Sequence, residues 1–171
     1  TPQQGLVAGA LSATGNRQLL EQPVLVFHIS GGTTDLLLCE NLQVLRTVGT
    51  STDLYAGQAV DRVGVKLGFA FPAGAEVSRL AAQCDEPVQR AKVTLQGTNC
   101  SLSGLENQCD RLLRQGKSPA YVCRFCLEAV GLTVLKMIAA ARQEYPGLPV
   151  VCAGGVMSSD IIRRQVSRQA K

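Results

Sequence analysis

Residues 28–35 read His28-Ile29-Ser30-Gly31-Gly32-Thr33-Thr34-Asp35 and connect two apolar stretches, residues 24–27 and 36–39. Both stretches are continuously apolar, which predicts strands that are buried on both faces of a sheet. Paired glycines let backbone amides turn inward, and the flanking hydroxyl groups add further donors. The segment therefore predicts a hairpin whose tip binds phosphate. The alternative is a hairpin turn that binds nothing.

A second glycine pair, Gly154-Gly155, follows a short predicted strand at residues 149–153 and precedes Ser158, Ser159 and a helical pattern. Amides at a helix start point outward with the positive end of the helix dipole, so a nucleotide phosphate can bind there. Neither glycine pair has the third glycine or the Lys-Ser/Thr of the two common phosphate-loop motifs. We expect the two bends to face one nucleotide pocket.

Composition indicates one globular domain over residues 1–171, with 46% hydrophobic and 18% charged residues. Apolar runs stay shorter than the roughly 18 residues of a membrane helix, so we expect no membrane partner. The net charge of +4 is modest. The chain begins at Thr1 and stops at Lys171 within a helical pattern, which favours a fragment of a longer protein.

Seven cysteines form an odd set in mostly apolar surroundings, as expected of reduced thiols in a cytoplasmic protein. The closest pair, Cys123 and Cys126, has the spacing of one helix face. With one histidine in the chain and no second Cys-x-x-Cys, two core cysteines are favoured over a zinc site.

Apolar spacing and end signals predict a mixed α/β fold with a buried sheet and helices packed on it. Thr52 or Asp53 is expected to cap a helix over residues 56–67, and Ser103 with Glu106 has the form of a capping box. Ser118-Pro119 predicts the start of the longest helix. Further helices are expected at residues 5–13, 77–81, 105–115 and after Ser159, and further strands at residues 42–48 and 92–95.

Five segments, taken in order and at this spacing, resemble the TsaD family, whose members also carry the name O-sialoglycoprotein endopeptidase or glycoprotease. They are His28–Thr34, Ala56–Arg62, Pro72–Gly74, Ser101–Leu105 and Ala153–Val156. The resemblance implies an actin-like (ASKHA) fold of two lobes with a nucleotide in the cleft. This chain would supply most of the second lobe, with the first lobe and the C-terminal end missing.

The resemblance also implies the residues that contact an adenine nucleotide or threonylcarbamoyl-adenylate. Asp61 matches an aspartate that binds ribose hydroxyls, which suits a carboxylate that accepts two hydrogen bonds; the alternative is an exposed helix aspartate. The complete implied set is His28, Ser30, Gly31, Gly32, Thr33, Asp61, Gly74, Gly154, Gly155 and Ser159.

Family members hold a catalytic metal with a His-x-x-x-His pair on a helix before the first strand. Pro2 and Leu6 stand at those positions here, and neither side chain can bind a metal. The family's aspartate ligand would lie beyond Lys171, so no metal is expected from this chain. Further departures are Thr33 for a histidine of the phosphate loop, Gln58 for a glutamate and Ser159 for an asparagine.

The family transfers a threonylcarbamoyl group from its adenylate onto a tRNA adenosine with partner subunits, so the resemblance implies a TsaB-like partner. The departures leave three readings open: an active transferase, a catalytically impaired or regulatory nucleotide-binding relative, and another ASKHA protein such as a small-molecule kinase. Protease chemistry is not supported, because His28 has no evident nucleophile or acid partner. The candidates for contact with tRNA are four basic residues near the end, Arg163, Arg164, Arg168 and Lys171; the alternative is a solvated helix surface.

Overall fold

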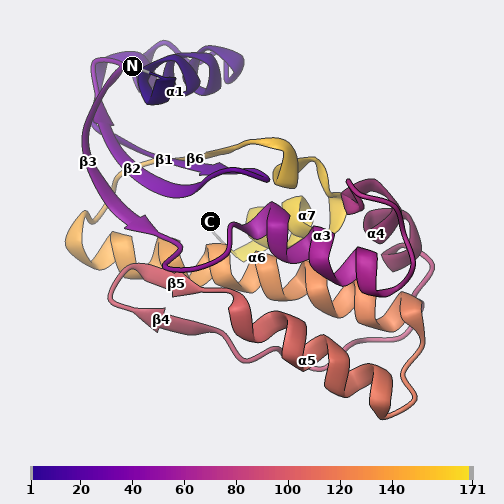
Figure 1. Ribbon diagram of the computed structural model, residues 1–171. Coiled ribbons are helices and arrows are strands. Elements are labelled where there is room, and N and C mark those ends of the chain that lie inside the picture. Colours follow the sequence, from indigo (N-terminus) through magenta and orange to yellow (C-terminus); the bar gives the residue numbers. More distant parts are fainter. Residues whose placement is uncertain (1, 170–171) are drawn as a thin grey trace.

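The computed structural model of the protein describes residues 2–169 (Figure 1). A four-stranded sheet has the order β3-β2-β1-β6, in which β1 lies antiparallel to β2 and parallel to β6, and β2 lies antiparallel to β3. Its strands are β1 (Val24–Ile29), β2 (Thr34–Glu40), β3 (Gln43–Thr50) and β6 (Val150–Ala153). The predicted hairpin at residues 28–35 is thus the β1–β2 connection.

Both faces of β1 are buried, as the continuous apolar run predicts. Leu25, Phe27 and Ile29 belong to the main core, whereas Val24 and Val26 belong to a smaller core. This alternation follows from the two-residue period of a strand. The sheet is therefore a middle layer, covered by helix on both faces.

The helices divide unequally between the two faces (Figure 1). Helix α1 covers one face, where Val7 and Leu11 pack in the smaller core, while the helices after the first hairpin gather on the other. The helical elements are α1 (Pro2–Ala13), α2 (Gln18–Glu21), α3 (Ala56–Lys66), α4 (Gly74–Ala81), α5 (Ser103–Arg114), α6 (Pro119–Glu144), the 3-10 helix η1 (Gly155–Ser158) and α7 (Asp160–Gln169).

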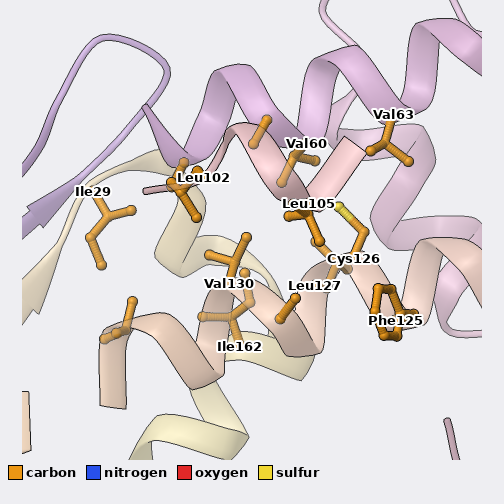
Figure 2. Close-up of a cluster of buried hydrophobic side chains, with 14 of the residues drawn as sticks. Ile29, Val60, Val63, Leu102, Leu105, Phe125, Cys126, Leu127, Val130 and Ile162 are labelled. Carbon is orange, nitrogen blue, oxygen red and sulfur yellow. The ribbon is translucent and has the colours of Figure 1, made fainter. Parts of the chain in front are cut away.

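Helix α6 runs through the main core and is buried on most sides. The side chain of Ser118 accepts a hydrogen bond from the Tyr121 N–H at 3.2 Å, and Pro119 occupies the first turn, as predicted. Figure 2 shows how this helix meets its neighbours in the core. The labelled side chains come from β1 (Ile29), α3 (Val60, Val63), the α5 start (Leu102, Leu105), α6 (Phe125, Cys126, Leu127, Val130) and α7 (Ile162).

Two predicted helix caps are wrong. Asp53 does not cap α3, whose first amides bind elsewhere: the Tyr55 N–H donates to Gln58 Oε1 at 3.0 Å, and the Ala56 N–H donates to Thr34 Oγ1 at 2.8 Å. Ser103 does not form a capping box either, since the residue before α5 is Leu102 and makes no side-chain cap. The start of α3 is instead satisfied by the local side chain of Gln58 and by the distant side chain of Thr34.

Asp53 instead caps α5, a helix that lies far from it in the sequence. Its carboxylate accepts hydrogen bonds from the Leu102 N–H at 2.8 Å, the Ser103 N–H at 3.3 Å and the Ser101 hydroxyl at 2.6 Å. Partial burial of Asp53 opposes ionisation, but hydrogen bonds from residues 101–103 and from Leu54 outweigh it and hold the pKa well below the usual value. A carboxylate at the positive end of the helix dipole stabilises α5.

A small hairpin departs from the single strand expected at residues 92–95. It consists of β4 (Thr94–Gln96) and β5 (Asn99–Ser101), joined by a turn that contains Gly97 with φ +64°. The third strand of the sheet and the helices at α3, α4, α5 and α6 are found where they were expected.

All seven cysteines are free, and six of them are buried. Burial raises the pKa of the Cys123 thiol to about 12, so this thiol is protonated at neutral pH. Cys123 and Cys126 both lie in the core, as favoured above. Among the helices within residues 2–169, none is both long enough and apolar enough to span a membrane.

Candidate nucleotide-binding site

The hairpin tip at residues 30–33 is a tight turn that closes on itself. The Ser30 N–H donates to the Thr33 carbonyl oxygen at 2.7 Å, and the Ser30 hydroxyl accepts from the Gly32 N–H at 3.2 Å. Gly31 and Gly32 do not take the left-handed backbone angles that glycine uniquely favours. The glycines here are therefore not required by φ, contrary to the reason that the sequence pattern implied.

Gly57, at the start of α3, is the glycine whose missing side chain lets α3 approach the hairpin tip, whereas a Cβ on Gly31 would meet nothing within 4 Å. The Gly57 N–H donates to the Ser30 carbonyl oxygen at 3.1 Å, and a Cβ on Gly57 would lie 2.5 Å from Gly31 Cα. Two backbones therefore touch at this point, and only glycine at position 57 permits it. Gly57 was not among the predicted site residues, although a glycine in the first turn of a helix is an available signal.

At the second bend, Gly154 is the residue that must be glycine. Gly154 has φ +107° and ψ 165°, and a Cβ there would lie 2.1 Å from the Ile29 carbonyl oxygen. Position 154 thus needs glycine both for its backbone angles and for its close approach to β1. Gly155, which follows, begins η1 and is free of such contacts.

The two bends face one cavity of about 450 Å³, in the size range of small-molecule sites. Five of the predicted site residues line it together: Gly31, Asp61, Gly74, Gly155 and Ser159. Residues outside the predicted site set complete the wall. These include Gly57, Val60, Pro72, Ser78, Leu127, Val156, Ser158 and Ile162.

The other predicted site residues lie outside this lining. Ser30 and Gly32 shape the hairpin tip, and Gly154 shapes the second bend. His28 and Thr33 line a different, small cavity beside Leu6 of α1. They lie there because His28 alternates with Phe27 and Ile29 along β1 and so points to the α1 side.

Asp61 lines the cavity and also stabilises its wall. Its Oδ1 atom accepts a hydrogen bond from the Ala73 N–H at 2.8 Å, which ties the α3–α4 connection to α3. None of the described residues donates a hydrogen bond to its Oδ2 atom. Asp61 is therefore fixed in place with one acceptor atom left for a hydroxyl group.

Among the described residues that line the cavity, Asp61 alone is charged, and none is a lysine or an arginine. Apolar side chains from α3, α6 and α7 supply most of the wall, as at Val60, Leu127 and Ile162. Ser159 also lines it, and its hydroxyl accepts a long hydrogen bond of 3.5 Å from the Ile162 N–H at the start of α7. Such a lining suits an uncharged flat ring and its hydroxyl-bearing sugar better than a row of phosphates.

The residues near α1 do not fit a metal ion. The cavity there has about 10 Å³ and is walled by Leu6, Val26 and Leu37. His28 contributes a buried Nδ1 atom without a hydrogen-bond partner, and Asp35 already accepts a hydrogen bond from Thr50. Within residues 2–169 no three His, Cys, Asp or Glu side chains come together as a metal would require.

The basic residues near the end of the chain lie on α7. Arg163 forms an ion pair with Asp160, while Arg164 and Arg168 are exposed. Lys171 lies outside the described residues. One of the arginines expected to bind tRNA is thus already paired.

The chain is similar in sequence to one family of known proteins. The family model for tRNA N6-adenosine threonylcarbamoyltransferase, TsaD, matches residues 4–171. A protein of that name from Geotalea uraniireducens (strain Rf4) is 33% identical over 161 residues, which cover 89% of this chain and 47% of the relative. One from Streptococcus pneumoniae (strain Hungary19A-6) is 29% identical over 171 residues, 95% of this chain and 51% of the relative. The chain spans about half the length of the curated relatives it matches.

Solved structures of low sequence identity share the fold. Full-length HypF in its phosphate- and nucleotide-bound form has a TM-score of 0.72 at 13% identity, covering 90% of this chain and 36% of HypF. Component A of the Acidaminococcus fermentans (R)-2-hydroxyglutaryl-CoA dehydratase has a TM-score of 0.60 at 16% identity, covering 95% and 57%. The expected actin-like (ASKHA) α/β fold with a mixed sheet is confirmed. Because the family model matches nearly the whole length of this chain, the chain belongs to the TsaD, or tRNA N6-adenosine threonylcarbamoyltransferase, family.

Proposed function

We propose that this chain forms one lobe of a TsaD-type protein and that its cavity of about 450 Å³ binds the adenosine part of an adenylate. The observation that carries the proposal is the meeting of Gly31, Asp61 and Gly155 at this one cavity, although they come from distant parts of the chain. The reaction that the family description names is threonylcarbamoyl transfer onto a tRNA adenosine, and the function of this chain is related to that reaction.

The cavity offers a partner for each part of an adenosine. Apolar side chains such as Leu127 and Ile162 would pack against the base, and Asp61 Oδ2 would accept a hydrogen bond from a ribose hydroxyl. The phosphate of the adenylate would lie at the hairpin tip, where Gly31 lines the cavity. In line with this proposal, HypF was solved with phosphate and nucleotide, and the Clostridium difficile activator of 2-hydroxyisocaproyl-CoA dehydratase, with a TM-score of 0.56, was solved with ADPNP.

We further propose that the transfer step is impaired in this chain, which would then act as a nucleotide-binding or regulatory relative. Pro2 and Leu6 carry no metal-binding atoms, and the cavity beside Leu6 is too small and too apolar for an ion with its ligands. The family match weighs against the small-molecule kinase.

Partners of the whole protein follow from the same proposal. We expect a TsaB-like subunit, a tRNA substrate and a cytoplasmic location. Of the tail residues, exposed Arg164 and Arg168 are the better candidates for phosphate contacts, because Arg163 is paired with Asp160. A second lobe would close the cavity, so ligand binding is best measured on the full-length protein.

Calorimetric titration of the full-length protein with AMP and with a threonylcarbamoyl-adenylate analogue tests the proposal. Asp61→Asn keeps an oxygen for the Ala73 N–H and removes the negative acceptor. We expect it to weaken binding by about 10- to 150-fold, since a hydrogen bond to a charged group contributes about 1.5–3 kcal/mol. Asp110→Asn removes a carboxylate outside the cavity and should leave affinity unchanged. Absence of binding by the unaltered protein would reject the proposal.

A further inference from the structure

Thr34, the first residue of β2, is a buried polar residue outside the candidate site. It is 2% exposed, and it is not among the described residues that line the cavity of about 450 Å³. Its hydroxyl oxygen accepts a hydrogen bond from the Ala56 N–H at 2.8 Å, and its carbonyl oxygen accepts one from the Ser51 N–H at 3.2 Å. Both hydrogen bonds therefore join the hairpin to the segment where α3 begins.

A further hydrogen bond ties the start of α3 to the same hairpin. The Gly57 N–H donates to the Ser30 carbonyl oxygen at 3.1 Å. Ala56 and Gly57 are the first two residues of α3, so their N–H groups have no partner inside the helix. Gly57 also lies against the backbone of Gly31, which prevents a closer approach. The position of α3 relative to the hairpin tip is thus fixed by these contacts.

The face of α3 that these contacts orient is the face that carries Asp61. Asp61 lies one helical turn after Gly57, and both residues line the cavity together with Val60. The position of α3 therefore determines how far the Asp61 carboxylate lies from Gly31 at the hairpin tip. A hydrogen bond from a hydroxyl group needs a distance of about 2.5–3.0 Å, so a shift of α3 by about 1 Å would weaken it strongly.

We propose that Thr34 is a positioning residue for the nucleotide: its hydroxyl holds α3 so that Asp61 can accept a hydrogen bond from the ribose while the phosphate lies at the hairpin tip. This role rests on the proposed function, because the ligand is the adenylate in the cavity. Thr34 acts through the Ala56 N–H and touches no part of the ligand. Loss of its hydroxyl should therefore remove the benefit of the ribose hydroxyls and leave the packing of the base.

Calorimetric titration of the full-length protein with AMP and with dideoxy-AMP, which lacks both ribose hydroxyls, tests this role. The unaltered protein should bind AMP about 10- to 150-fold more tightly than dideoxy-AMP, the range for a hydrogen bond to a charged group. Thr34→Val has nearly the same shape but no acceptor. It should lower this preference at least about fivefold, as expected for groups coupled through one hydrogen-bond network. Thr34→Ser keeps the oxygen and should retain the preference.

Thr133→Val is the matched control, because Thr133 is also buried and its hydroxyl donates to the Ala129 carbonyl oxygen at 2.8 Å within α6. It removes a hydroxyl from the core at a distance from the start of α3 and should leave the preference unchanged. Thermal unfolding should show that each variant is folded. Thr34→Ala is the second variant, since it also removes the acceptor but leaves space for a water molecule at the Ala56 N–H.

Hydrogen exchange without ligand measures the contact itself. The Ala56 amide should exchange faster in Thr34→Val than in the unaltered protein or in Thr133→Val. An unchanged exchange rate would overturn the inference, and so would an equal loss of affinity for AMP and dideoxy-AMP in Thr34→Val, because a general loosening of the fold affects both ligands alike. Both results leave the proposed function intact. Absence of AMP binding by the unaltered protein would instead reject the proposed function, and the role of Thr34 with it.

Discussion

The two faces of the sheet differ in the cavities that lie on them: the face toward α6 has a large one, and the face toward α1 has a small one. Toward α6 lie the glycine bends, Asp61 and a cavity of about 450 Å³, with backbone contacts at Gly57 and Gly154 that leave no room for a side chain. Toward α1 lies a cavity of about 10 Å³ with leucine and valine walls. Steric constraint is therefore concentrated on one side of β1, the side on which we propose that a nucleotide binds.

The largest effect should come from Gly154, where the constraint on the α6 face is strongest. Gly154→Ala adds a Cβ 2.1 Å from the Ile29 carbonyl oxygen and forces alanine into backbone angles that are almost exclusive to glycine. We expect the free energy of unfolding to fall by at least about 3 kcal/mol, as measured by urea denaturation.

Two other glycines serve as controls for that substitution. Gly5 lies in α1 on the opposite face, has open space around its Cα and has ordinary helical angles. Gly5→Ala should therefore stabilise the protein by about 0.5–1 kcal/mol. Gly155→Ala is next to Gly154 but meets nothing within 4 Å, so its effect on stability should be small. A destabilisation as large at Gly155 as at Gly154 would contradict this account of the bend.

A smaller loss is expected from Asp53, which joins α5 to the start of α3 on the α6 face. Its folded pKa is depressed below the unfolded value near 3.9, so its carboxylate contributes stability above about pH 4. That contribution disappears as pH falls through the folded pKa. Asp53→Ala should cost about 1–2 kcal/mol at pH 7, the usual range for a helix cap.

Denaturation between pH 7 and pH 2 measures the pH dependence. The difference in unfolding free energy between the unaltered protein and Asp53→Ala should shrink as the pH falls below 4, because the protonated carboxyl is a weaker acceptor. A difference that stays constant over this range would show that the ionised form of Asp53 is not what stabilises α5.

Local patterns predicted what depends on neighbours in sequence, and missed what depends on distant segments. The hairpin at residues 28–35 and the Ser118 cap are local, and both are found. Asp53 instead caps a helix about 50 residues further along, because folding brings β5 and the start of α5 against the chain before α3. No spacing rule within one helix could have indicated this.

The predicted site shows the same division. Two glycine pairs were enough to predict that two bends meet at one cavity. The positions that require glycine, however, depend on which backbone lies opposite: Gly57 lies against Gly31, and Gly154 lies against Ile29, while a Cβ on Gly31 itself would meet nothing within 4 Å. His28 lines the small cavity beside α1 and not the cavity of the glycine bends, because a pattern of residue types does not reveal which face of the strand a side chain will occupy.

The smallest effect is expected from removal of metal, which tests the α1 face. Treatment of the full-length protein with a chelator should leave its melting temperature and its AMP affinity unchanged, because Pro2 and Leu6 offer no ligand atoms and the adjoining cavity has room for no hydrated ion. Elemental analysis of the untreated protein should find no tightly bound divalent metal in stoichiometric amount. His28 and Asp35 are the two candidate ligands on this face, so the variant His28→Gln supplies the contrast. If a stoichiometric metal is present and is lost in His28→Gln, then this face has kept metal chemistry by a different set of ligands, and the difference between the two faces of the sheet must be explained in another way.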